Sequence, residues 1–300
     1  MRLIDGSWSG IRYRLSVVGD PFREHCSRLR IVCAKFRAKA RAVLSFLLAA
    51  LVLVHCSKPC QTASMTAIRG ARERARSEIT AAIKDEARRQ LAAEGAAKLS
   101  LRAVARELGM ASSALYRYFP SRDDLLTALI VDAYNAVGEA AEAARDAVTG
   151  PDAKRPVARW SAVCAAVRTW ALAHPHEYAL IYGSPVPGYT APRTTAGPAS
   201  RVGLALIGVV RDAHAAGALK EPAEPLPDAV VGEALALGAE LGVELPGAVL
   251  TRLVGAWAQL FGLVSFEVFG QFNGVIAART EFFEQAVHQL ARSVGLAAPR

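Results

Sequence analysis

The stretch Leu101–Leu126, LRAVARELGMASSALYRYFPSRDDLL, changes its hydrophobic periodicity twice. Its first eight residues place apolar side chains at i, i+3, i+4 and i+7, which predicts an amphipathic helix, and Gly109 is a typical C-terminal stop. A second short helix follows to about residue 118, and Pro120 prevents its continuation. Ser121 and Asp124 form a capping box that opens a third helix. Two short helices joined by a glycine-containing turn and packed on a third make a helix-turn-helix.

The second short helix has an outward face of small or hydrogen-bonding residues. A helix of about two turns is not stable alone, so packing on its neighbours has to hold it. Small side chains allow close approach to a major groove, while hydroxyl and guanidinium groups read base edges and phosphates. The same pattern also fits an ordinary solvated helical hairpin. The outward-facing residues are Ser112, Ser113, Tyr116 and Arg117.

The composition indicates a soluble, alanine-rich helical protein, with 52% hydrophobic and only 7% aromatic residues. Its 300 residues are enough for roughly two domains. No run of 18 or more apolar residues occurs, so we expect no stable membrane association. The sequence also lacks a nucleophile elbow, a Walker loop and a dinucleotide fingerprint. We therefore expect a protein that is not an enzyme and needs no cofactor.

The formal net charge of +9 is unevenly distributed. Residues 1–64 carry 11 Lys and Arg against 3 Asp and Glu, residues 65–126 carry 12 against 8, and the remainder carries 13 against 16. The total charge is therefore a poor indicator of nucleic-acid binding. The local basic excess around the helix-turn-helix is a better one, because clustered basic side chains neutralise phosphates.

Residues 1–64 differ in composition from the rest of the chain. They hold four of the five cysteines, a basic stretch that ends at Arg41, and an apolar run of 13 residues, 42–54. Secretion and anchor signals combine a basic region with a short apolar core, so a membrane-tethered regulator stays one alternative. We expect instead a disordered or non-native extension, with the helical protein starting near Met65. The fifth cysteine, Cys164, is predicted to be a small buried hydrophobe.

Residues 76–130 resemble the N-terminal domain of the TetR family of bacterial transcription regulators. The residues that carry the resemblance are EG at 94–95, LSLRAVARELGM at 99–110 and ALYRYFPSRDDLL at 114–126. The last segment matches the family signature Leu-Tyr-x-Tyr/His-Phe-x-Ser-Lys-x-x-Leu, with Arg122 in place of the usual Lys. The resemblance implies a cytoplasmic homodimer, usually a repressor, that binds palindromic operator DNA. It also implies release of that DNA when a small molecule enters the C-terminal domain.

The resemblance further implies which residues contact DNA. Small side chains at the start of the second short helix approach the bases, and tyrosines and arginines hold phosphates, helped by the start of the preceding helix. Ala111 stands where many members have a capping Ser, and Ser112 is expected to take over that cap. Together with the outward-facing Arg117, the expected DNA-binding residues are Ser100, Arg102, Ser112, Ser113, Ala114, Tyr116, Tyr118 and Arg122.

The stretch WALAHPHEYALIYGSPVPGY, residues 170–189, resembles a branch of the family whose C-terminal domain carries a Trp, a His and a Gly in this order. Pro175 predicts the start of a helix, and GSPVPGYTAP, residues 183–192, predicts a loop. Aromatic side chains here would give a pocket apolar walls and polar handles, which favours a small apolar or aromatic effector; core packing is the alternative for each of them. The predicted effector-binding residues are Trp170, His174, Tyr178, Tyr182 and Tyr189.

A metal site is not expected in this stretch. His174 and His176 are two residues apart, which is not the i, i+4 spacing that puts two imidazoles on one helix face. Only Glu177 could add a further ligand beside them. A helical small-ligand or metal sensor without DNA binding remains the alternative function.

Apolar stripes in the last quarter of the chain predict at least two more helices after the proline-rich connector EPAEPLPD, residues 221–228. Such stripes are either intramolecular core or, as the resemblance implies, part of a four-helix dimer interface. The predicted dimer-interface residues are Trp257, Leu260, Phe261, Val264, Val268, Phe283, Val287 and Leu290.

We therefore predict an all-α protein with a three-helix DNA-binding domain and a helical ligand-binding and dimerisation domain. The DNA-binding domain is expected over residues 70–120. The effector-binding and dimerisation domain is expected over residues 121–295, after the non-native or disordered extension of residues 1–64.

Overall fold

The chain divides into two compact units, residues 1–75 and 76–300. In the first unit, β1 (Ser7–Trp8) pairs antiparallel with β2 (Ile11–Arg12). The rest of the extension predicted over residues 1–64, its apolar run included, lies outside the described residues. The computed structural model describes residues 7–8, 11–12, 69–150, 155–220 and 224–296.

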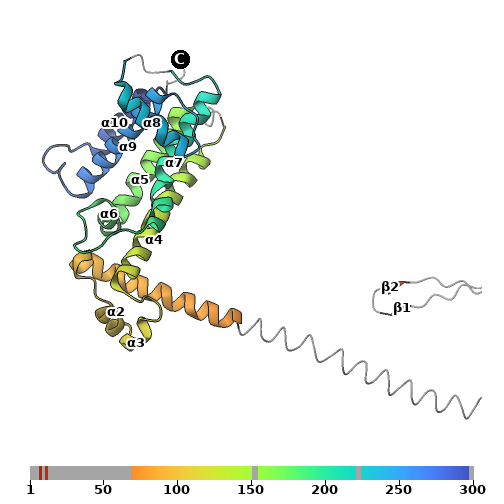
Figure 1. Ribbon diagram of the computed structural model, residues 1–300, viewed down its shortest axis with the longest axis vertical. Coiled ribbons are helices and arrows are strands. Elements are labelled where there is room, and N and C mark those ends of the chain that lie inside the picture. Colours follow the sequence, from red (N-terminus) through yellow and green to blue (C-terminus); the bar gives the residue numbers. More distant parts are fainter. Residues whose placement is uncertain (1–6, 9–10, 13–68, 151–154, 221–223, 297–300) are drawn as a thin grey trace, which may run out of the picture. The chain divides into compact units, whose positions relative to one another are not determined.

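The second unit is helical in every regular element described, apart from an isolated bridge between Leu219 and Leu296, and this confirms the all-α prediction. A helix over residues 69–94, called the first helix below, leads into this unit (Figure 1). The elements that follow are η1 (Ala96–Lys98), α2 (Leu101–Glu107), α3 (Ser112–Leu115), α4 (Arg122–Ala147), α5 (Pro156–Ala173), α6 (Pro175–Tyr182), η3 (Arg193–Thr195), α7 (Ala196–Ala215), α8 (Asp228–Glu240), α9 (Gly247–Val268) and α10 (Arg279–Ser293).

The head of the unit consists of the first helix, α2, α3 and the first turns of α4. The Oγ atom of Ser100 caps α2 by accepting a hydrogen bond from the Ala103 amide at 3.4 Å. Gly109 ends this helix with φ of 63°, a left-handed conformation that glycine adopts without strain. Ala111 is the N-cap of α3 and offers no side-chain bond, so the expectation that Ser112 replaces the cap is wrong: Ser112 is the first helical residue.

The long helix α4 joins the head to the body of the unit, which comprises α5 to α10 (Figure 1). The N-cap half of its predicted capping box is confirmed, because Ser121 Oγ accepts a hydrogen bond from the Asp124 amide at 3.1 Å, while the Asp124 carboxylate accepts from the Ser121 hydroxyl. Leucines in its first two turns are buried in the head core, and the small residues that follow are buried in the body core. These residues are Leu125, Leu126 and Leu129 in the head, and Ala133, Val137 and Ala141 in the body.

The body core is held together by apolar packing and by internal ion pairs. Trp160 and Cys164 on α5 are fully buried, and burial raises the pKa of the Cys164 thiol, as expected for a structural cysteine. Arg168 on α5 forms a bidentate pair with Glu267 on α9, with N–O distances of 2.6 and 2.7 Å. Polar side chains in the body thus connect helices to each other.

Among the described residues, one helix, α9, has the length and apolar composition of a membrane span, with a mean hydropathy of 1.4. A core helix of a globular protein can have the same properties. In this structure α9 packs against α5, α8 and α10, and its inward face supplies buried residues to the body core.

Candidate DNA-binding interface and ligand cleft

The recognition surface of the head is the exposed side of α3 and the turn after it. Ser112, Ser113, Tyr116 and Arg117 are all exposed, and 42% of the Tyr116 surface is accessible. Leu115, on the opposite side, is fully buried and anchors the short helix in the head core. The structure therefore gives α3 the outward polar face that its sequence pattern predicts.

A hollow of about 450 Å³ lies between the start of α2 and the turn before α4. Arg102 is exposed at its edge, and Tyr116 borders it from the recognition surface. Pro120 and Ser121 also line it, and the Ser121 hydroxyl donates a hydrogen bond to the Asp124 carboxylate at 2.7 Å. Hydroxyl and guanidinium groups around one hollow are suited to holding a phosphate.

Arg122 borders the same hollow, but its guanidinium is already engaged. Nη2 donates a hydrogen bond to the Ala96 carbonyl at 2.8 Å, and Nε donates one to the Leu99 carbonyl at 3.2 Å. The side chain is 29% exposed and also approaches Asp123 at 3.5 Å. Arg122 thus braces η1 against the start of α4, which differs from the free phosphate contact implied by the family resemblance.

Three further residues of the predicted DNA-binding set are less exposed than the recognition surface, and one of them, Ser100, is the cap of α2. Tyr118 is half-buried, with the guanidinium of Arg76 5.6 Å from its ring centroid. Ala114 is also half-buried. Tyr118 therefore contacts the first helix and is only partly available to DNA.

Most of the predicted effector-binding residues are packed into the body. The Trp170 ring stacks on His174 at a centroid distance of 5.2 Å, and His174 Nδ1 lies 3.0 Å from the Trp170 carbonyl. Tyr178 is fully buried, and its hydroxyl donates to the Phe261 carbonyl at 3.2 Å. Burial raises the pKa of Tyr178 to about 12. Trp170 and Tyr178 are buried, so core packing is the better interpretation for these two, whereas His174 is exposed at the junction of α5 and α6.

Tyr182 and Tyr189 differ from these three. Tyr189 lies in the loop after α6, and its hydroxyl is 2.9 Å from the hydroxyl of Thr127 on α4. The ring of Tyr182 stacks on Phe261 at 4.1 Å, and burial raises the pKa of its phenol. Of the five predicted residues, only Tyr182 lines the large cleft described next.

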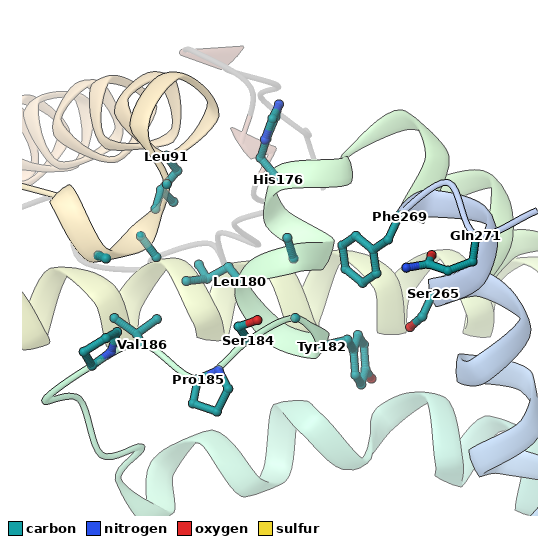
Figure 2. A pocket seen from close by; sticks show the side chains of 16 residues that line it. Leu91, His176, Leu180, Tyr182, Ser184, Pro185, Val186, Ser265, Phe269 and Gln271 are labelled. Atoms are coloured by element: carbon teal, nitrogen blue, oxygen red, sulfur yellow. The ribbon is translucent and has the colours of Figure 1, made fainter. Parts of the chain in front are cut away.

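The α6 cleft, defined here, is a hollow of about 840 Å³ between the head and the body (Figure 2). The end of the first helix and η1 form one wall, and α6, the loop after it and the end of α9 form the other. His176 is the only titratable side chain in the lining besides Tyr182. The lining residues are Leu91, Gly95, Ala96, Ala97, His176, Ala179, Leu180, Tyr182, Gly183, Ser184, Pro185, Val186, Pro187, Ser265, Phe269 and Gln271.

The sequence pattern gave no indication of this cleft. It predicted a loop at residues 183–192 but not that the start of this loop faces residues 91–97 of the head. Proline and glycine in GSPVPG only signal where α6 ends. The partners across the cleft are about 90 residues apart in sequence, beyond the range of helical periodicity.

The predicted dimer stripes are mostly intramolecular core. Leu260, Phe261, Val264, Phe283, Val287 and Leu290 are each at most 7% exposed, so they cannot form a contact surface without repacking. Val268 is half-buried against the same core. Trp257 is 38% exposed but lines a groove between α7, α8 and α9.

The opposite sides of α9 and α10 form a different apolar surface, called the outer face here. Phe266 on α9 is 53% exposed and Phe282 on α10 is 37% exposed. Both rings contact Phe272, with centroid distances of 5.7 and 5.5 Å. A hollow of about 630 Å³ on this face is also lined by Gln259, Gly262, Leu263, Gln285, Ala286 and Gln289.

Two family profiles match this chain. Residues 83–129 match one described as bacterial regulatory proteins of the tetR family, and residues 160–290 match one described as the tetracyclin repressor-like C-terminal domain. The narrower resemblance to the Trp-His-Gly branch stays a prediction. The chain is 42% identical over 219 residues to the HTH-type transcriptional regulator Rv1816 of Mycobacterium tuberculosis, which covers 71% of this chain and 89% of that regulator. The regulator Mb1846 of Mycobacterium bovis is similar to the same extent.

Solved structures agree with these sequence similarities. The crystal structure of SCO4313, described as a regulatory protein, is 34% identical, with a TM-score of 0.58 over 73% of this chain and 97% of that one. A protein of unknown function from Rhodococcus sp. RHA1, 23% identical, shares the fold, with a TM-score of 0.55 over 72% and 95% of the two chains. Regulators of the TetR family bind operator DNA, act as dimers and are generally cytoplasmic. The chain belongs to the TetR family and is a DNA-binding transcriptional regulator with a helix-turn-helix head.

Proposed function

We propose that this protein is a cytoplasmic repressor that binds a palindromic operator as a homodimer and releases it when a small neutral effector binds. The observation that carries the proposal is the exposed polar side of α3, with two serines, a tyrosine and an arginine beside Arg102. Small hydroxyl side chains suit direct contact with bases, and exposed guanidinium groups suit phosphates. No catalytic step is part of this proposal.

The serines and the arginines have different expected roles on DNA. Ser112 and Ser113 begin α3 and are both exposed, so we assign them to base contacts. Arg102 and Arg117 are exposed and have no ion-pair partner among the described residues, which leaves both free for phosphates. Arg122 is assigned a positioning role instead, because backbone carbonyls already occupy its guanidinium.

The experiment selects operator duplexes from a genomic library and measures their affinity by fluorescence anisotropy over a range of salt concentrations. Arg102→Ala should weaken binding to every sequence and lower the salt slope by about one phosphate contact. Ser112→Ala and Ser113→Ala should change which duplex is preferred. Arg145→Ala on α4, remote from the recognition surface, is the matched control and should behave as the wild type. A salt slope that is the same in Arg102→Ala and in the control would refute the assignment of this surface.

The outer face of α9 and α10 is our proposed dimer interface. Its phenylalanines are exposed while the core face of the same helices is filled by their own chain. Phe266→Lys should convert a dimer into monomers in sedimentation equilibrium, because a charge on this apolar patch would be buried without a partner. Val230→Lys on α8, where the valine is 42% exposed, is the control and should leave the dimer intact. A dimeric Phe266→Lys variant would exclude this face.

A further inference from the structure

The walls of the α6 cleft come from two parts of the unit that a regulator has to couple. Leu91, Ala96 and Ala97 belong to the head, whereas Leu180 and Val186 belong to the body. Leu180 and Val186 also pack directly against the head core. A molecule in this cleft would therefore touch both parts at once, and its binding would depend on how they are oriented.

The chemistry of the lining restricts what can bind. The cleft contains no Asp, Glu, Lys or Arg side chain, so a charged ligand would lose hydration without gaining a partner. Phe269 and the ring of Tyr182 line its body side, and Ser184 and Ser265 add hydroxyl groups (Figure 2). A volume of about 840 Å³ is within the range of sites for drug-sized molecules. The lining fits a neutral, largely aromatic or apolar molecule with one or two hydrogen-bonding groups.

An ion pair connects the two walls beside the cleft. Glu177 directly follows the lining residue His176 on α6, and its carboxylate accepts a hydrogen bond from Arg88 Nε at 3.2 Å. Arg88 is on the first helix, one turn before the lining residue Leu91. The two side chains are 30% and 20% exposed, so the pair is partly shielded from solvent. Any change in the separation of α6 from the first helix would change the energy of this pair.

The other contacts of Arg88 do not reach α6. Its Nη2 atom donates to Asp132 on α4 at 2.8 Å, and Lys84 donates to the same carboxylate at 2.9 Å. These bonds keep the first helix attached to α4 whether or not α6 moves. Loss of the Glu177 charge would therefore leave Arg88 paired, and the head should stay folded.

The head wall of the cleft is itself bound to the helix-turn-helix. The carbonyls of Ala96 and Ala97 accept hydrogen bonds from Arg122, the first residue of α4, at 2.8 and 3.3 Å. A displacement of η1 would thus be transmitted to the turn that precedes α4 and borders the hollow of about 450 Å³ beside Arg102.

We propose that the α6 cleft is the effector site of this regulator, that it takes a neutral aromatic or apolar molecule, and that the Arg88–Glu177 ion pair couples its occupancy to the orientation of the head. This inference rests on the proposed repressor function and names its site, its ligand class and its coupling contact. The coupling is a free energy shared by two binding events, so the effector weakens operator binding by the factor by which the operator weakens effector binding.

The test uses N-phenyl-1-naphthylamine, a neutral aromatic fluorophore, as the probe, with the full-length protein and a selected operator duplex. Probe affinity is measured by fluorescence with and without operator, and operator affinity by anisotropy with and without probe. In the wild type we expect the two ligands to weaken each other by the same factor, at least about fivefold. Circular dichroism melting curves confirm that each variant is folded.

Two variants, each with a bulky side chain in a different hollow, test where the probe binds. Ala179→Phe places a ring in the α6 cleft and should weaken probe binding at least about tenfold. Gly203→Phe is the matched control, because it fills the apolar groove between α7, α8 and α9, where a Cβ at Gly203 meets no atom within 4 Å. It should leave probe binding unchanged. Loss of binding in Gly203→Phe rather than in Ala179→Phe would overturn the assignment of the site, and no binding by the wild type would overturn the ligand class.

Two charge-neutralising variants test the coupling contact. Glu177→Gln should still bind probe and operator separately. The factor by which each ligand weakens binding of the other should fall at least about threefold. Asp212→Asn removes a comparable ion pair, Arg159–Asp212 between α5 and α7, and should couple as the wild type does. Full coupling in Glu177→Gln would exclude the ion pair while leaving the site intact. A wild type that binds the probe in the cleft without any effect on operator affinity would instead refute the proposed effector-released repressor.

Discussion

The recognition surface of the head and the body of this regulator use their polar side chains in opposite ways. In the head, hydroxyl and guanidinium groups on α3 and α2 are exposed, and the short helices are held by a small core to which α4 contributes three leucines. In the body, arginines and tyrosines bind to neighbouring helices, as Arg168 does to Glu267 and Tyr178 to α9. Polar residues on the recognition surface are thus available to a partner, whereas those in the body, like Arg122 in the head, maintain the framework that positions this surface.

The largest expected effect would come from breaking an internal ion pair of the body. Glu267→Ala leaves Arg168, which is only 16% exposed, without its bidentate partner, and should lower the free energy of unfolding by roughly 4 kcal/mol. Operator affinity of the folded fraction should not change. Urea unfolding followed by circular dichroism measures the loss. Asp146→Ala, which removes an exposed ion pair with Arg145 on α4, should have no measurable effect on the free energy of unfolding. Equal losses of unfolding free energy in the two variants would show that the internal pair contributes no more than the exposed one.

Matched leucines in the two cores should separate local from global stability. Leu115 in the head and Leu206 in the body are both fully buried, and each change to Ala should cost roughly 3 kcal/mol. Leu206→Ala should accelerate hydrogen exchange throughout the body, because that core joins α4 to the later helices. Leu115→Ala should accelerate exchange mainly in α2 and α3. Uniform acceleration in both variants would mean that head and body open as one unit.

The smallest expected effect concerns alkaline pH. Burial raises the pKa of Tyr178 to about 12, above its ordinary value of 10, so the unfolded chain releases this proton first as the pH rises. The contribution to stability is complete below pH 10 and is lost as the pH approaches 12. Buried Tyr182 and Cys164 act in the same direction. Tyr178→Phe should therefore show a smaller decline in unfolding free energy between pH 9 and about pH 11 than the wild type. An equal decline would show that Tyr178 ionises normally.

The head was largely predictable because its determinants are local. The glycine at 109, the proline at 120 and the Ser121 cap each act within a few residues, and they define α2, α3 and the start of α4 without reference to the rest of the chain. The bracing role of Arg122 was not predictable in the same way. Its carbonyl partners are 23 to 26 residues upstream, and only the folded head brings them together.

Periodicity in the body identified the helices but not the neighbours of each face. An apolar stripe looks the same in sequence whether its own chain or a second chain covers it. Phe261 and Phe266, five residues apart on α9, illustrate this: one is in the core and the other is 53% exposed. The aromatic residues between 170 and 189 presented the same ambiguity, and the cleft depends on contacts between distant segments.

Because α4 is long, a small change in its tilt is enough to misalign the head on DNA. Its 26 residues span about 39 Å, and residues of this one continuous helix are buried in both the head core and the body core. A tilt of about 5° at the body end displaces the head end by about 3 Å over that length, comparable to a whole hydrogen-bond distance. Two recognition helices in a dimer have to match successive major grooves about 34 Å apart. A lever of this length converts a slight rotation into a misfit with the double helix, without unfolding any part of the head.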